Sequence, residues 1–154
     1  MPAYRIAGIP HSLATEARES LKSPQYGHPA HVELATGYGP CRLCLRTFQE
    51  GVEQRLLFTY QPFTDPGALP APGPVFIHLE ACERYDGNDL PEALRALPLA
   101  LDGYGTGGEL LLHRRVATES FEDVMAHVFE PEAVRYAHLR NAEAGCFIAR
   151  IDRC

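Results

Sequence analysis

The sequence lacks long hydrophobic runs, and this absence excludes several classes of protein. No stretch approaches the roughly 18 apolar residues that a transmembrane helix requires. The first part of the chain contains neither the apolar segment nor the small-residue cleavage pattern of a signal peptide. We therefore expect a cytoplasmic protein with no membrane association.

Lysine is also scarce, and negative charge dominates. Only Lys22 among the 14 basic residues is a lysine, a composition typical of GC-rich bacterial genomes. The 20 acidic residues give a net charge of −6. Because an acidic surface repels nucleic acids and anionic lipids, the composition disfavours both as partners. It leaves the actual partner unknown.

The chain shows no internal repeat and no low-complexity tract, and its 154 residues suit a single globular domain over 1–154. Short strand patterns joined mainly by short loops predict an α+β fold, with a largely antiparallel sheet of about six or seven strands and about three short helices. The expected strands include a short edge strand at 4–9, a hairpin of 41–48 with 55–60, a buried strand at 74–79, a pair at 97–102 and 109–116, and a terminal hairpin of 133–141 with 146–152. The expected helices start near Ser12, Leu90 and Phe121, with Ser12 and Ser120 as N-caps, and 24–40 and 62–74 are expected to be loops. Leu56, Phe58 and Tyr60 are expected to share one face of their strand. The residues expected to be buried in the sheet core are Phe58, Val75, Ile77 and Leu112.

The most specific local motif is the pair Cys41 and Cys44 in the segment Gly-Pro-Cys-Arg-Leu-Cys. A turn at this spacing can point both sulfur atoms at one ion, but tetrahedral zinc needs two more ligands. His78 and Cys82, at the end of the buried strand, are the best candidates. Together they predict a Cys3His zinc site, with zinc as the candidate cofactor.

Two other interpretations of these cysteines stay open. If 41–48 is a regular strand, Cys41 and Cys44 point to opposite faces and are ordinary core residues, as free cysteines often are. A redox pair of the thioredoxin type would instead need the first cysteine at a helix N-terminus. The segment after Cys41 alternates like a strand, which disfavours the redox interpretation.

A second cluster of reactive residue types lies near the C-terminus. His138, Arg140, Asn141 and Cys146 fall close together across a tight turn. A cysteine nucleophile requires a base within reach and donors for a developing oxyanion, and these residues are the candidate catalytic set. The alternative is that Arg140, Asn141 and Gly145 build the turn and that Cys146 begins a core strand.

Three blocks of sequence resemble one bacterial family of unknown activity. They are Pro40-Cys41-Arg42-Leu43-Cys44-Leu45, then 73–78 followed by 82–85, and finally 140–142 with 145–147. In these blocks the chain is similar to domain of unknown function 1203. The resemblance implies that an identifying pattern of the family includes Cys41, Cys44, His78, Cys82, Arg140, Asn141 and Cys146, whereas Cys154 lies outside it. It implies no activity.

Two hypotheses about function follow. The first is a binding or structural domain whose Cys/His cluster holds zinc, and the second is a small enzyme. In the enzyme, Cys146 or Cys82 is the nucleophile, with His78 or His138 as base. Under both hypotheses we expect the three blocks to meet in space, because antiparallel hairpins bring strand ends together.

Overall fold

The computed structural model of the protein describes residues 4–37, 39–62 and 73–154. In this part of the chain there are two α-helices, one short 3-10 helix and nine strands, and all strand pairs are antiparallel. The helices are α1 (His11–Ser20), η1 (Glu92–Leu94) and α2 (Phe121–Val128). The strands are β1 (Tyr4–Ala7), β2 (His31–Leu34), β3 (Gln54–Tyr60), β4 (Gly73–His78), β5 (Asp86–Gly87), β6 (Leu99–Tyr104), β7 (Leu110–Arg115), β8 (Tyr136–Asn141) and β9 (Phe147–Arg153).

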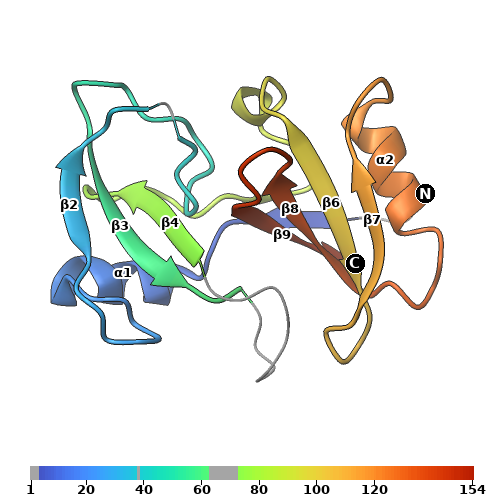
Figure 1. The fold of residues 1–154 in the computed structure, drawn as a ribbon, viewed down its shortest axis with the longest axis horizontal. Helices are drawn as coiled ribbons and strands as arrows, with labels where there is room; N and C mark the ends of the chain where they lie inside the picture. Colours follow the sequence, from blue (N-terminus) through green and yellow to red (C-terminus); the bar gives the residue numbers. More distant parts are fainter. Residues whose placement is uncertain (1–3, 38, 63–72) are drawn as a thin grey trace.

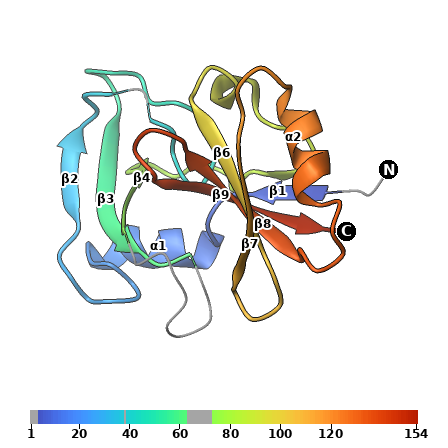
Figure 2. The same cartoon turned by 45° about the vertical axis from the view of Figure 1, so that its right-hand side comes forward.

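These strands form two sheets that lie beside each other (Figure 1). The smaller sheet has the order β2-β3-β4, and the larger has the order β5-β1-β9-β8-β6-β7. In Figures 1 and 2, α1 lies under the smaller sheet, α2 lies at the far side of the larger one, and the turn between β8 and β9 faces β4. None of the helices in the described ranges has the length and apolar content needed to cross a bilayer.

The smaller sheet has its own hydrophobic core. Because side chains alternate along a strand, Leu56, Phe58 and Tyr60 of β3 share one face, and all three are buried. Ile77 of β4 pairs with Leu56 and is completely buried. The fully buried Ala17 of α1 belongs to the same core, and its small side chain allows the helix to approach closely.

The larger sheet packs against α2. Val124 and Val128 are buried on the face of α2 that meets the sheet, in one core with Leu101 and Leu139. The hydroxyl of Ser120 accepts a hydrogen bond from the backbone N–H of Asp123, which caps this helix at its start. The expected cap, helix and terminal hairpin are therefore confirmed.

The α+β class and the antiparallel pairing are confirmed, but one predicted hairpin is wrong. Residues 41–48 form a turn and irregular chain, and β3 pairs with β2 and β4 instead. β2 was missed because it lies inside the Pro- and Gly-rich stretch 24–40, which was expected to be loop. The loop 41–48 packs into both cores, and its apolar residues are buried for this reason. Their spacing in the sequence resembles the alternation of a strand.

Smaller corrections concern element ends and the numbers of elements. The helix expected at 90–97 is only the 3-10 turn η1, which leaves two α-helices in the described residues where three helices were expected. The first helix starts at His11 and has no side-chain cap from Ser12. The described residues form nine strands, more than the six or seven expected. β1 lies between β5 and β9 and is not an edge strand. Leu112, expected to be buried, is only half-buried because β7 is a sheet edge. Of the loop expected at 62–74, residues 63–72 lie outside the described residues, and Gly73 and Pro74 belong to β4.

Gly8 is the point at which the loop 41–46 contacts the chain between β1 and α1. A Cβ atom on Gly8 would lie 2.2 Å from the carbonyl oxygen of Leu43 and 2.5 Å from that of Arg42. Only glycine therefore permits this backbone approach. We expect Gly8→Ala to lower the free energy of unfolding by about 1–3 kcal/mol, measured by denaturant titration. Gly37→Ala, whose Cβ would have its nearest neighbour at 3.9 Å, is the control, and equal stability of the two variants would contradict the prediction.

Candidate metal centre

The loop 41–46 turns so that both of its cysteines point the same way. The backbone N–H of Leu45 donates to the carbonyl of Cys41 at 2.9 Å, and Leu45 has a left-handed φ of 61°. The N–H of Arg42 donates to the carbonyl of Phe76 at 2.9 Å, which attaches the loop to β4. This turn removes the objection that Cys41 and Cys44 would lie on opposite faces of a strand.

β4 ends beside this loop and supplies the other two members of the cluster. The N–H of His78 donates to Sγ of Cys41 at 3.3 Å, and Nδ1 of His78 lies 3.4 Å from Sγ of Cys44. Sγ of Cys82, in the following loop, lies 3.9 Å from Sγ of Cys41. The ligand atoms of all four residues lie within 4.8 Å of one another. The predicted convergence of the first two sequence blocks is therefore found.

The spacing of these atoms fits a tetrahedral metal ion. With Zn–S bonds of about 2.3 Å and Zn–N bonds of about 2.0–2.1 Å, tetrahedral geometry places neighbouring sulfurs about 3.8 Å apart and sulfur and nitrogen about 3.6 Å apart. The observed 3.9 Å between Cys41 and Cys82 and 3.4 Å between Cys44 and His78 are close to these values. All five cysteines are free thiols. The Cys3His cluster can thus hold a metal ion.

The remaining nitrogen of His78 meets a carboxylate. Nε2 of His78 lies 3.1 Å from Oε2 of Glu53, while Oε1 of Glu53 accepts the N–H of Gln49 at 2.8 Å. The bond to Gln49 is the largest cause of the lowered pKa of Glu53. Metal-binding histidines commonly donate their second N–H to a carboxylate, which fixes the tautomer and the ring orientation. Glu53 therefore orients Nδ1 of His78 toward the cysteines.

We expect Glu53→Gln to weaken zinc binding about 10- to 100-fold, because the amide no longer accepts the N–H of His78 as a carboxylate does. The measurement is competition against a chromophoric zinc chelator. Glu50→Gln, an exposed acid in the same turn, is the matched control because it removes the same charge. Equal zinc affinity in the two variants would show that Glu53 does not support the site.

Two arginines supply positive charge beside the cluster. Nη2 of Arg18, on α1, donates to Sγ of Cys82 at 3.3 Å, and its Nε donates to the carbonyl of His78 at 3.0 Å. A hydrogen bond to Cys44 is the main cause of the raised pKa of Arg46. Zn²⁺ with three thiolates carries one net negative charge, and Glu53 adds another. The two guanidinium groups balance both charges, so the surroundings suit a thiolate-bound divalent ion.

The cluster also favours the ionised form of one cysteine. Hydrogen bonds from Cys41 and Cys82 hold the pKa of Cys44 far below its usual range, whereas sharing its proton with Cys44 raises the pKa of Cys41. The interaction with Cys44 raises the pKa of His78 to about 10. A thiolate at Cys44 is the form that binds metals.

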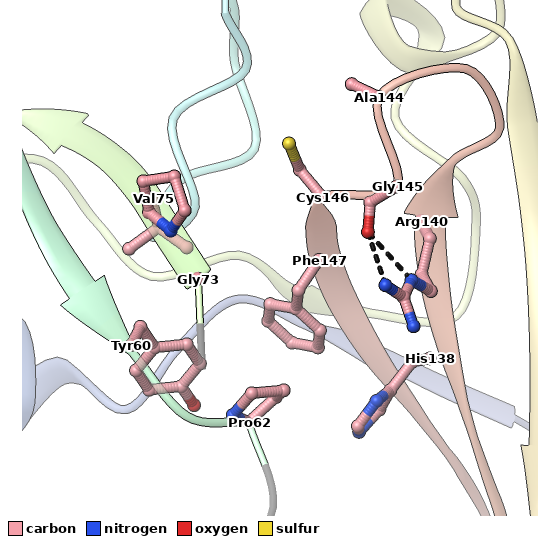
Figure 3. A pocket seen from close by; sticks show the side chains of 11 residues that line it. Tyr60, Pro62, Gly73, Val75, His138, Arg140, Ala144, Gly145, Cys146 and Phe147 are labelled. Atoms are coloured by element: carbon pink, nitrogen blue, oxygen red, sulfur yellow. Dashed lines mark hydrogen bonds between the residues drawn. The ribbon is translucent and has the colours of Figure 1, made fainter. Parts of the chain in front are cut away.

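The third sequence block lies at a separate cavity between the two sheets (Figure 3). His138, Arg140 and Cys146 line this cavity, whereas Asn141 does not. The side-chain oxygen of Asn141 accepts the N–H groups of residues 143 and 144, each at 2.9 Å, so it builds the β8–β9 turn. One contact joins the two places: Nε of Arg42, in the cysteine loop, donates to the carbonyl of Phe147 at 2.8 Å.

Three residues of the metal centre were missed in the sequence. Glu53 and Arg46 are close in sequence to the expected ligands or strands, but nothing in a single sequence distinguishes them from other surface charges. Arg18 is 60 residues from His78, whose carbonyl it binds, and only the packing of α1 against the smaller sheet brings it there.

The chain was compared with known proteins. No curated protein and no solved structure shows significant similarity to it. The profile of one family, described as "Protein of unknown function (DUF1203)", matches residues 38–153. This range contains the cysteine loop, β4 and the β8–β9 hairpin. The chain therefore belongs to the DUF1203 family.

Proposed function

We propose that this chain is a zinc-binding domain in which Cys41, Cys44, His78 and Cys82 hold one structural Zn²⁺. The observation that carries the proposal is the convergence of four ligand atoms within 4.8 Å. Four protein ligands complete a tetrahedral shell and leave no position for a substrate, which favours a structural role over a catalytic one. The carboxylate on His78 and the two arginines near the thiolates support the same proposal.

Zinc would join parts of the chain that are far apart in sequence. The loop 41–46 also contacts Gly8 and accepts the N–H of Tyr85 at the carbonyl of Leu43. An ion between this loop and the end of β4 would therefore stabilise the contact between the two sheets. A reducing compartment such as the cytoplasm suits this role, because it keeps the ligands as thiols.

The test is elemental analysis of the purified protein together with titration of its thiols. We expect one zinc per chain, with the three cysteines of the cluster protected and only Cys146 and Cys154 reacting rapidly. A chelator should release the zinc and expose the three protected thiols together. The proposal would be contradicted if the protein, after reconstitution with zinc and desalting, retained no metal.

A cysteine-dependent enzyme is the second candidate, because Cys146, His138 and Arg140 line one cavity. Burial first, and then the charges of Arg150 and Arg140, lower the pKa of His138 to about 3. A histidine with this pKa is neutral at pH 7 and is a weak general base. Metal-free protein with one unusually fast thiol at Cys146 would favour the enzyme over the zinc domain. Cys82 and His78 are ligands in the proposed zinc site, so the enzyme hypothesis depends on Cys146 as the nucleophile.

A further inference from the structure

The cavity between the sheets has walls from both of them. Its volume is about 210 Å³, below the ~300–1,000 Å³ of pockets for drug-sized ligands, so it suits a smaller molecule. Figure 3 shows β3 and β4 on one side and the β8–β9 hairpin on the other. Arg140 and Phe147 come from the hairpin, and Tyr60 and Val75 come from the smaller sheet.

An aromatic row forms the apolar part of the cavity. The centroid of the Phe147 ring lies 5.6 Å from that of Tyr60 and 5.0 Å from that of His138. The rings of Phe147 and His138 meet edge to face. Val75, on β4, adds an apolar side chain on the side of the cavity opposite Phe147 (Figure 3). Burial raises the pKa of Tyr60 to about 12, so this hydroxyl, like the imidazole of His138, is uncharged at pH 7.

Arg140 is the one charged side chain among the lining residues that the structure describes. Its Nε and Nη2 both donate to the carbonyl of Gly145, and its Nη1 lies 3.3 Å from Oδ2 of Asp102. Arg140 also bonds to the hydroxyl of Tyr104. These bonds hold the guanidinium in place from behind. Arginine has five N–H donors and these contacts use four, so one donor remains for an acceptor in the cavity.

The charge behind the cavity is also positive. Arg42 is buried, and its guanidinium donates to two carbonyl oxygens, those of Phe147 and Pro40. Within the described ranges, no carboxylate forms an ion pair with Arg42. Asp102 balances the charge of Arg140, so the surplus at the cavity is the single positive charge of Arg42, which contrasts with the net charge of −6 of the chain. Buried positive charge next to an apolar wall favours an anion that also carries an apolar group.

We propose that this cavity binds a small organic carboxylate, with its anionic group against Arg140 and its apolar part against Phe147 and Val75. The proposal does not depend on zinc binding at the cysteine cluster. It assigns the β8–β9 turn a recognition role: the turn fixes Arg140 through the carbonyl of Gly145. Cys146 lies at the edge of the proposed site, so the rate at which its thiol is alkylated can be used to detect a bound molecule.

The test compares the alkylation of Cys146 by iodoacetate and by iodoacetamide, two reagents of nearly equal size. In both reactions the thiolate forms a bond to the CH2 carbon while the C–I bond breaks and iodide leaves. Any change in thiolate content affects both rates equally, so their ratio measures preference for the carboxylate. We expect the iodoacetate-to-iodoacetamide ratio at Cys146 to exceed that of N-acetylcysteine amide about tenfold, as one charge-assisted hydrogen bond would give. Peptide mapping by mass spectrometry separates Cys146 from Cys154 and the cluster cysteines.

Competition on the unchanged protein provides a second measurement. Butyrate should protect Cys146 from alkylation, and butyramide should not, while exposed Cys154 should be unaffected by both. Arg140→Gln should return the iodoacetate-to-iodoacetamide ratio at Cys146 to that of the free thiol, and Arg140→Lys should retain part of the increase. The control is Arg95→Gln, which changes an exposed arginine paired with Glu122 and should leave the ratio unchanged. A Cys146 ratio equal to that of the free thiol with no protection by butyrate would overturn the proposal. So would a Cys146 that neither reagent reaches, since the cavity would then not admit a carboxylate of the size of iodoacetate.

Discussion

Replacing Cys44 with serine is expected to abolish zinc binding and to lower the free energy of unfolding by about 4 kcal/mol or more, since loss of a metal is among the largest single-site effects. Cys44 is the member of the cluster whose ionised form is most favoured, and a serine hydroxyl is a poor zinc ligand. Metal binding at such a site is coupled to folding, so its free energy contributes to stability. Zinc content and denaturant unfolding, measured on the same sample, test both expectations.

The matched control is Cys154→Ser, which makes the same change at an exposed cysteine outside the cluster. It should retain one zinc per chain and the stability of the unchanged protein. A chelator should lower the stability of the unchanged protein to that of Cys44→Ser but should leave Cys44→Ser itself unaffected. If Cys44→Ser keeps a full zinc and unfolds normally, Cys44 is only a core cysteine.

Ile77→Ala is expected to cost about 2–5 kcal/mol through the cavity that it leaves in the smaller core. Ile77 is completely buried, and it pairs across the sheet with Leu56, which is equally buried. Thermal unfolding followed by circular dichroism gives the measurement. Leu111→Ala, on the exposed edge strand β7, should change the stability by less than about 0.5 kcal/mol and serves as the control.

The same experiment tests the proposal that 1–154 is one domain. Leu45, in the cysteine loop, is buried in the core of the larger sheet, while its neighbour Cys44 is buried in the core of the smaller one. A loop shared in this way should make the two sheets unfold together, so Ile77→Ala should shift one transition of the whole chain. Two separate transitions, of which only one moves, would mean that each sheet is its own domain. An unchanged midpoint would mean that Ile77 carries no packing energy.

Sequence reasoning found the parts of this protein that depend on local pattern. The Ser120 cap, the alternation of Leu56 and Phe58, and the terminal hairpin follow from short-range rules, and all three are present. The spacings of Cys41 with Cys44 and of His78 with Cys82 likewise pointed to the cluster because zinc ligands recur at such intervals.

The failures have a common physical cause in tertiary packing. Apolar residues in 41–48 looked like a strand, yet they are buried because a turn inserts them between two cores. β2 carries exposed Val32 and Leu34 on a sheet edge, so it lacks the buried alternation that marks a strand. Arg18 reaches the cluster only because α1 docks under the smaller sheet, which no spacing along the chain reveals.

Arg42 connects the two proposed sites. It lies between two candidate metal ligands in the sequence, and its guanidinium binds the carbonyl of Phe147, whose ring lines the cavity. An ion bound by the loop 41–46 would therefore also help to fix a wall of the cavity. Linkage is reciprocal for binding free energies: if zinc raises the affinity for a carboxylate by some factor, the carboxylate raises the affinity for zinc by the same factor. Measuring either affinity with the other site filled and empty would give the coupling free energy between the two sites.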